Sequence, residues 1–178
     1  MMKYNFIPAL LILFVLSCCS TLKPESFSSS TPILDPVKFF GGHTSSAGVM
    51  EARSGKPSVR ITTKTAGIYT HGILSIEQDL YPENGKQNHR SFNLKLVDAH
   101  HVEGTGSDIA GTARGELYGN YFTWRFRLKI AGKGLVQHVN MTQYMYLMPD
   151  GKTLIIRSVV RKFGMIVKQI TEQFHKDD

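Results

Sequence analysis

Four polar side chains in this 178-residue sequence fall on positions that strand alternation assigns to the inside of a domain. They are Gln78, Arg90, Gln143 and Ser158. The same alternation puts large apolar side chains on that inner side: Phe122, Trp124, Phe126, Met141 and Met145. Apolar walls with a few polar groups are typical of pockets that bind small molecules. This set therefore predicts a binding site for a hydrophobic molecule or lipid with a polar head.

A purely structural role for these residues is the alternative. An unpaired buried polar group costs about 1–3 kcal/mol, so the four could satisfy one another, or Arg90 could lie at a wet rim. Gln143 and Ser158 are expected to face each other across two strands, and Gln78 and Arg90 to be diagonal neighbours. The aromatic and methionine side chains would then simply fill the core. By the same alternation, the inner side also extends to Lys168 and Glu172.

The sequence contains no pattern that predicts catalysis, a metal ion or a cofactor. The seven histidines are scattered, and the adjacent pair His100-His101 would point to opposite faces of a strand. No cysteine–histidine spacing typical of zinc sites occurs, and the GxSxG motif of a nucleophilic serine is absent. Most carboxylates fall on outward positions. We therefore expect no catalytic residue, no metal ion and no cofactor.

A period-two pattern from Phe39 onward must position the inner residues. In "YFTWRFRLKI", residues 121–130, apolar and polar side chains alternate, which is typical of a strand with one wet side. Nine or ten strands are expected, at about 43–52, 57–66, 72–81, 87–97, 100–106, 109–118, 121–130, 135–148, 152–162 and 165–174. Short turns predict an all-β, antiparallel up-and-down meander closed into a lipocalin-like barrel, with a two-sheet β-sandwich as the alternative. The charged outward faces exclude a membrane-spanning barrel.

Hairpin turns predict which residues face each other. Two-residue turns are expected at Gly119-Asn120, Gly132-Lys133 and Asp150-Gly151. They set Trp124 opposite both Gly115 and Met141, and Gln143 opposite Ser158. All three turns keep the apolar positions on one face, whereas a register wrong by one residue would not.

Two connections break this two-residue pattern. At Asn84-Gly85 a loop of three or five residues keeps inward Ile76 opposite Leu94, whereas a two-residue turn would not. The inward positions also switch shortly before residue 109. That switch predicts a bulge or bend near Ser107-Asp108.

The N-terminus predicts export and a lipid anchor. Residues 6–16 are almost wholly apolar, a length that suits a signal peptide and is too short to span a membrane. Ser17-Cys18 resembles the cleavage site of bacterial lipoproteins, with Cys19 as second choice for the lipid, and the chain has no other cysteine. We expect a signal peptide at 1–17, a lipid-anchored flexible tether at 18–35 and one barrel domain at 36–178. A secretory signal with two incidental cysteines is the alternative.

Such an anchor would hold the protein to a membrane of the bacterial cell envelope. The residues that follow lack the aspartate that commonly retains lipoproteins at the inner membrane, so the outer membrane, facing the periplasm, is favoured. The net charge is +7, or +6 without residues 1–17. Basic residues cluster in two groups: Arg125, Arg127 and Lys129, and then Lys152, Arg157, Arg161 and Lys162. They form either a solvated face or a surface for anionic lipid headgroups, and outside the cytoplasm no nucleic-acid partner is expected.

Four stretches carry a resemblance to a known family. "FFGGHTSSAGV", "ARGELYGNYFTWRFRL", "MYLMPDG" and "RKFG" are similar to the bacterial lipoproteins grouped as domain of unknown function family 3833. The resemblance runs from about Phe39 to Phe174. It implies an envelope lipoprotein with a lipocalin-like barrel and implies no established activity. Three hypotheses remain: a barrel that binds a hydrophobic small molecule or lipid, an accessory lipoprotein that binds a protein partner, and an enzyme that acts on lipid.

Overall fold

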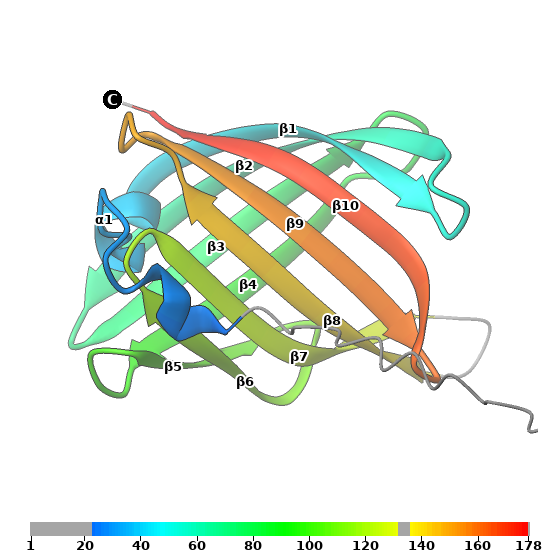
Figure 1. Ribbon diagram of the computed structural model, residues 1–178. Helices are drawn as coiled ribbons and strands as arrows, with labels where there is room; N and C mark the ends of the chain where they lie inside the picture. The colour runs from blue at the N-terminus through cyan, green and yellow to red at the C-terminus, as the bar shows by residue number, and fades with distance from the viewer. Residues whose placement is uncertain (1–22, 132–135, 178) are drawn as a thin grey trace, which may run out of the picture.

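The computed structural model describes residues 23–131 and 136–177, and within them ten antiparallel strands form one closed barrel (Figure 1). Each strand pairs with its neighbours in sequence, and β1 pairs with β10 to close the ring. The strands are β1 (Gly42–Ala52), β2 (Pro57–Thr70), β3 (Ile73–Pro82), β4 (Asn88–Leu96), β5 (His101–Gly106), β6 (Ile109–Tyr118), β7 (Tyr121–Ala131), β8 (Val136–Leu147), β9 (Thr153–Lys162) and β10 (Met165–Lys176). The predicted closed meander is confirmed, and the alternative of a two-sheet sandwich is wrong.

Two of the predicted hairpins have the expected register. Gly115 lies opposite Trp124 across the β6–β7 hairpin, and Gln143 lies opposite Ser158 across the β8–β9 hairpin. The irregularity expected near Ser107-Asp108 lies slightly further along, between Ala110 and Arg114 of β6. Gly111 there has a φ of +79°, a backbone conformation that is easy only for glycine.

Two other predicted registers are wrong by two residues. Trp124 faces Gln143 instead of Met141, and Ile76 faces Phe92 instead of Leu94. The β7–β8 connection is longer than predicted, since the last pair before it is Ala131 with Val136. The β3–β4 connection has five residues, 83–87, which is one of the two predicted lengths, and only its register differs. The predicted turn Gly132-Lys133 itself lies outside the described residues. A shift of two residues leaves every side chain on the expected face, so the same residues face the inside of the barrel as predicted.

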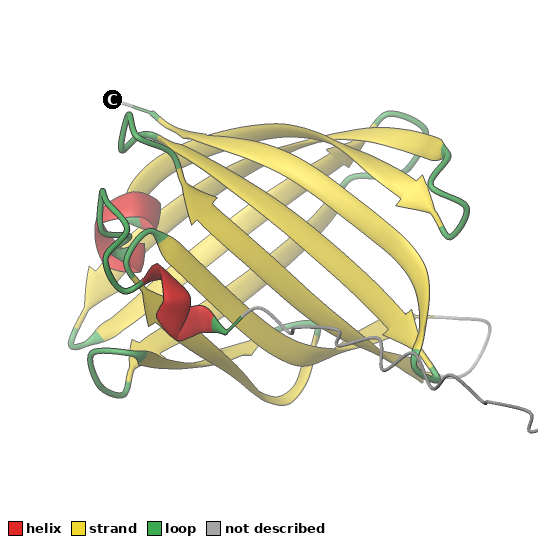
Figure 2. Cartoon of the chain, in the orientation of Figure 1, coloured by secondary structure: helices red, strands yellow, loops and turns green. Residues whose placement is uncertain are grey.

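A short helix closes one end of the barrel (Figure 2). Helix α1 (Pro36–Phe40) begins with proline at its first position, and the Asp35 carboxylate accepts hydrogen bonds from the backbone N–H groups of Val37 and Lys38 at 2.9 and 3.2 Å. The helix buries Phe39 and Phe40 in the barrel core. We call the opposite end, where the turns β1–β2, β3–β4, β5–β6 and β9–β10 lie, the distal end. No helix in the described part of the chain is long and apolar enough to cross a membrane.

The prediction of a tether without a fold is wrong for residues 23–35. The 3₁₀ helix η1 (Pro24–Phe27) lies against β6 and β7, where the Phe27 ring stacks on Tyr121 with 4.6 Å between ring centroids. Further along, Leu34 is 1% exposed and its N–H donates to the Gly119 carbonyl at 2.8 Å. The serine-rich composition suggested disorder, but Phe27 and Leu34 supply enough apolar surface to hold the segment on the barrel. Cys18, Cys19 and the rest of the expected tether lie outside the described residues.

Replacing Phe27 with serine should release this segment. The stacked contact and the buried area of the ring are lost, so the free energy of unfolding should fall by about 1–2 kcal/mol in a urea titration. Glu25→Gln, an exposed position on the same helix, is the control and should change little. Equal stability of the Phe27→Ser variant and the wild type would show that the segment contributes nothing to the fold.

Candidate functional site

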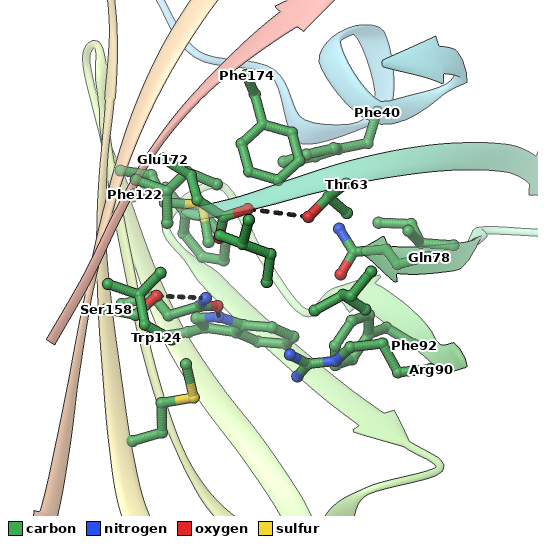
Figure 3. Close-up of a pocket in the computed structure, with 18 of the residues that line it drawn as sticks. Phe40, Thr63, Gln78, Arg90, Phe92, Phe122, Trp124, Ser158, Glu172 and Phe174 are labelled. Atoms are coloured by element: carbon green, nitrogen blue, oxygen red, sulfur yellow. Dashed lines mark hydrogen bonds between the residues drawn. The ribbon is translucent and has the colours of Figure 1, made fainter. Parts of the chain in front are cut away.

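The barrel encloses a cavity with apolar walls and a few polar groups (Figure 3). Its volume is about 110 Å³, which is more than one water molecule needs and less than the roughly 300–1,000 Å³ of ordinary ligand pockets. Phe40 and Phe174 line it near α1, and Met50 and Leu80 line it on the side of the distal end. The barrel is therefore neither hollow like a lipocalin nor completely filled.

Eight of the nine residues predicted for ligand binding line this one cavity. They are Gln78, Arg90, Phe122, Trp124, Met141, Gln143, Met145 and Ser158. Phe126 does not line it, although its buried ring packs edge-on against Trp124 at 5.1 Å. The predicted inward position of Lys168 is wrong, because a register shift between Ile166 and Lys168 in β10 leaves the lysine exposed. That the eight residues bind a ligand stays a prediction.

Trp124 stands in the middle of the wall because two glycines make room for it. A Cβ atom on Gly104 would lie 2.8 Å from the indole ring, and one on Gly115 would lie 2.8 Å from the Trp124 Cβ. Real side chains do not approach so closely, so these strand glycines are needed where β5 and β6 pass the indole. The alternating glycines of "GTARGELYGN" thus serve close packing.

Two of the four predicted polar residues, Gln143 and Ser158, are joined to each other by a hydrogen bond and to the Trp124 indole through Gln143. The Trp124 indole N–H donates to Gln143 Oε1 at 2.5 Å, and Gln143 Nε2 donates to Ser158 Oγ at 2.9 Å. Gln78 is also partnered, because its Nε2 donates to Thr65 Oγ1 at 3.2 Å. For these residues the structural interpretation explains their burial without a ligand.

Glu172 forms a second polar group in the cavity wall. Its Oε1 accepts hydrogen bonds from the Ser46 and Thr63 hydroxyls, both at 2.9 Å. Burial raises the pKa of this carboxyl, and the two hydroxyls and the charge of Arg90 only partly oppose that effect. Strand alternation places Glu172 on the inner side in the sequence, whereas Ser46 and Thr63 were not predicted to line the cavity. Their inward alternation on β1 and β2 was the available signal, and small hydroxyl residues are easily taken for ordinary strand positions.

Glu172 should make the stability of the fold depend on pH. Because folding raises its pKa, the folded state holds the proton more tightly than the unfolded state does, so stability should fall as the pH rises from the ordinary carboxyl pKa through the raised one. Glu172→Gln mimics the protonated form and should raise the Tm at neutral pH by a few degrees, with little gain at pH values below the ordinary carboxyl pKa. Glu103→Gln, an exposed carboxylate, is the control. A Glu172→Gln variant that is less stable at neutral pH would contradict this account.

Among the polar residues that line the cavity, Arg90 is the one with buried nitrogen atoms that make no hydrogen bond. Its side chain is 11% exposed and extends from β4 toward Trp124, with the guanidinium carbon 4.4 Å from the centre of the Phe92 ring (Figure 3). Asp108 Oδ2 lies 3.3 Å from Nε, but Nε and Nη2 make no hydrogen bond to any described residue. Burial lowers the pKa of Arg90, and the carboxylates of Asp108 and Glu172 oppose that effect. A buried guanidinium without full partners is costly, so a ligand with acceptor oxygens would be stabilised here.

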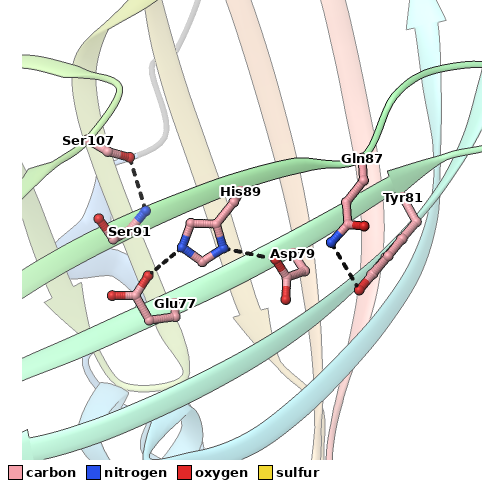
Figure 4. A network of polar contacts seen from close by, with 7 residues as sticks. All are labelled: Glu77, Asp79, Tyr81, Gln87, His89, Ser91 and Ser107. Carbon is pink, nitrogen blue, oxygen red and sulfur yellow. Dashed lines mark hydrogen bonds and ion pairs between the residues drawn. The ribbon is translucent and has the colours of Figure 1, made fainter.

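A separate polar cluster lies on the outer face of β3 and β4 (Figure 4). The two ring nitrogens of His89 lie 2.8 Å from Asp79 Oδ1 and 2.8 Å from Glu77 Oε2. The hydrogen bond with Asp79, followed by that with Glu77, raises the pKa of His89. All three side chains are about half exposed, so the cluster is a solvated surface network. Nowhere in residues 23–131 and 136–177 do three His, Cys, Asp or Glu side chains gather closely enough to hold a metal ion.

Comparison with known proteins agrees with this architecture. The S-type phycobiliprotein lyase CpeS from Guillardia theta is a structural neighbour at 7% sequence identity, with a TM-score of 0.58, over 82% of this chain and 94% of the lyase. A protein described as AttH from Nitrosomonas europaea matches at 11% identity over 83% of this chain and 57% of its own, with a TM-score of 0.25 that is too low to support an argument. No curated protein sequence matches.

The first neighbour shares the fold alone, since 7% identity says nothing about the site. The sequence itself matches a family model over residues 13–176, nearly its whole length. The match includes every strand of the barrel and the packed N-terminal segment. The chain belongs to the family described as protein of unknown function DUF3833.

Proposed function

We propose that the barrel binds an amphiphilic small molecule, with an apolar body in the cavity and an acceptor-rich head, such as a carboxylate, on Arg90. The observation that carries this proposal is the buried guanidinium at the wall of an apolar cavity. Two of its nitrogens make no hydrogen bond to the described residues, although Nε lies 3.3 Å from Asp108 Oδ2. Charged hydrogen bonds to a guanidinium are among the strong ones. An anionic head would complete this environment.

The position of Arg90 suggests how such a molecule would lie. Arg90 is close to the start of β4, toward the distal end, whereas Phe40 and Phe174 line the cavity near α1. The head would therefore lie toward the distal end and the apolar body toward α1. Because the cavity is small, a longer body would require the wall to adapt, and Met50, Met141 and Met145 are flexible enough to do so.

Fold analogy gives this proposal general support. Barrels of about eight strands can hold one small ligand, and the neighbour from Guillardia theta is named a phycobiliprotein lyase. The proposal is tested by producing the chain from Lys23 onward and weighing it under native conditions. A discrete extra mass of an acidic amphiphile supports it. Preparations without bound mass that also fail to take up added fatty acid contradict it.

The proposed location is the bacterial cell envelope, with a lipid on Cys18, or on Cys19 as second choice, and the outer membrane facing the periplasm as the favoured site. The apolar run before the cysteines supports this proposal. The packing of residues 23–35 would then leave only four residues between Cys18 and Lys23. At roughly 3.3–3.6 Å per residue, the folded part would begin within about 18 Å of the anchor, so any protein partner would also be met close to the membrane.

Cys18→Ser should abolish incorporation of a fatty-acid probe in bacteria, while Cys19→Ser should leave it unchanged. The reason is that only the cysteine at the cleavage site receives the lipid. The measurement is the mass of the mature protein together with probe labelling. Labelling lost only in Cys19→Ser would move the anchor to Cys19, and labelling absent from the wild type would contradict the anchor altogether.

A further inference from the structure

The net positive charge of this protein is concentrated in one part of the barrel. Residues 117–171 contain nine lysines and arginines against the single acidic residue Asp150, a net charge of +8. The rest of the chain has 12 basic and 13 acidic residues, a net charge of −1. The segment forms β7, β8, β9 and the larger part of β10, which are neighbours in the sheet. Lys133 lies outside the described residues, and without it the described part of this segment still carries eight basic residues against one acidic residue, a net charge of +7 on one side of the barrel.

Six cations on this side form no ion pair with a carboxylate of the described residues. Ion pairs of Lys or Arg elsewhere involve Arg60, Arg90 and Arg114. The following six have none: Arg125, Arg127, Lys129, Arg157, Arg161 and Lys162. Two of them donate only to neutral amides, Arg157 to Gln169 Oε1 and Lys162 to Gln137 Oε1, both at 2.7 Å. Unneutralised charges gathered on one side attract an anionic partner.

An exposed phenylalanine stands at the distal end of this basic side. Phe163 is 88% exposed at the tip of the β9–β10 hairpin, next to Met165, which is 50% exposed. The tip is a two-residue turn in which Phe163 has a φ of +51° and Gly164 a φ of +80°. Turns of this kind favour Asn-Gly, and a bulky residue at positive φ is strained. The Phe163 ring is therefore exposed to solvent beside Lys162, and the Phe163 backbone has a conformation that is unfavourable for a bulky residue.

We propose that the distal edge of β7–β10 docks on an anionic lipid bilayer, with Phe163 inserted among the headgroups and the basic side lying against them. Two interactions bind proteins to membrane surfaces. Apolar side chains insert at the interface, and cations are attracted to anionic lipids. A soluble acidic partner would use the charge but would not explain the exposed ring. The end closed by α1, which we call the capped end, also exposes apolar side chains, Ile68 at 70% and Tyr69 at 52%, but these belong to β2, outside the positively charged segment 117–171. This inference does not depend on the proposed ligand.

The test uses the chain from Lys23 onward, because a lipid anchor would bind membranes by itself. This chain keeps the closed ring of strands and the packed segment before it. It should co-sediment with vesicles of phosphatidylcholine containing phosphatidylglycerol, release as salt is raised, and bind pure phosphatidylcholine at least tenfold more weakly. Phe163→Asn should raise the Tm, since Asn suits the turn, and yet reduce binding to the mixed vesicles about tenfold.

A matched control exists at the capped end. His71 and Gly72 form the corresponding turn of the β2–β3 hairpin, with φ values of +53° and +79°. His71→Asn should therefore raise the Tm in the same way and leave vesicle binding unchanged. The proposal is overturned if Phe163→Asn binds like the wild type, if His71→Asn loses binding equally, or if neutral vesicles bind as well as anionic ones. It is also overturned if the folded wild type ignores vesicles and binds only a soluble polyanion such as heparin.

Discussion

Replacing Arg90 with methionine is expected to stabilise the barrel and at the same time to weaken its binding of an acidic amphiphile at least tenfold. The guanidinium is buried against Phe92, and two of its nitrogens find no hydrogen-bond partner in the described chain. Exchanging both members of a buried ion pair for apolar side chains often stabilises a protein by about 1–4 kcal/mol, whereas removing one member and leaving the other buried destabilises it. Asp108 is 25% exposed and can be solvated when its partner is lost, so we expect a net gain of no more than about 1 kcal/mol. Binding weakens because hydrogen bonds to a charged group contribute about 1.5–3 kcal/mol each.

Two variants separate these effects. Lys95→Met removes a cation from the outward face of the same strand, where the lysine is exposed, and should alter neither stability nor binding appreciably. Asp108→Asn leaves the guanidinium with still less compensation, so it should lower stability while binding of the acidic ligand persists. Arg90→Met protein that is destabilised and binds the ligand as the wild type does would show that Arg90 is structural.

Replacing Trp124 with alanine is expected to cost about 3–5 kcal/mol of the free energy of unfolding, the usual range for a large buried aromatic side chain. The indole is 3% exposed and packs edge-on against Phe92 at 5.7 Å and Phe126 at 5.1 Å. Its loss would enlarge the cavity and leave Gln143 Oε1 without a donor. Urea unfolding measures the effect, and a loss below about 1 kcal/mol would mean that the core is packed differently.

Trp124→Phe isolates the hydrogen bond from the packing. A ring remains, but Gln143 Oε1 is unsatisfied, so a cost of about 1–3 kcal/mol is expected. In combination with Gln143→Leu, the two costs should be non-additive by about 0.5–3 kcal/mol, because the first change already breaks the interaction that the second removes. Simple additivity would show that the 2.5 Å contact contributes nothing to stability.

The sequence was sufficient to predict the barrel because side chains alternate with period two. Even where the register was wrong by two residues, as for Trp124 with Gln143, the side chain stayed on its predicted face. The length of the β7–β8 connection could not be predicted, since Gly132-Lys133 looks like a two-residue turn although the pairing of Ala131 with Val136 spans four residues. The folded segment before α1 was also missed, because its two anchors, Phe27 and Leu34, stand alone among serines and prolines.

The cavity was predicted better than its electrostatics. Alternation placed Gln143, Ser158 and Trp124 together, and the structure joins them by hydrogen bonds. Alternation could not predict that these three residues form hydrogen bonds with one another while Arg90 lacks them, because hydrogen bonds depend on angles and distances that no sequence pattern encodes. The charge segregation of residues 117–171 was visible in the sequence, but its meaning required the knowledge that those strands are neighbours in a closed sheet.

Trp124 is the only tryptophan of the chain and lines the cavity, so its fluorescence reports directly on occupancy. The measurement that tests the central claim is a titration of the chain from Lys23 with decanoate and, separately, with 1-decanol, whose tail has the same length and whose head is uncharged. We expect a saturable one-to-one change with decanoate, binding of the alcohol at least tenfold weaker, and no such preference in Arg90→Met. An unchanged tryptophan signal, or equal binding of acid and alcohol, would contradict the account.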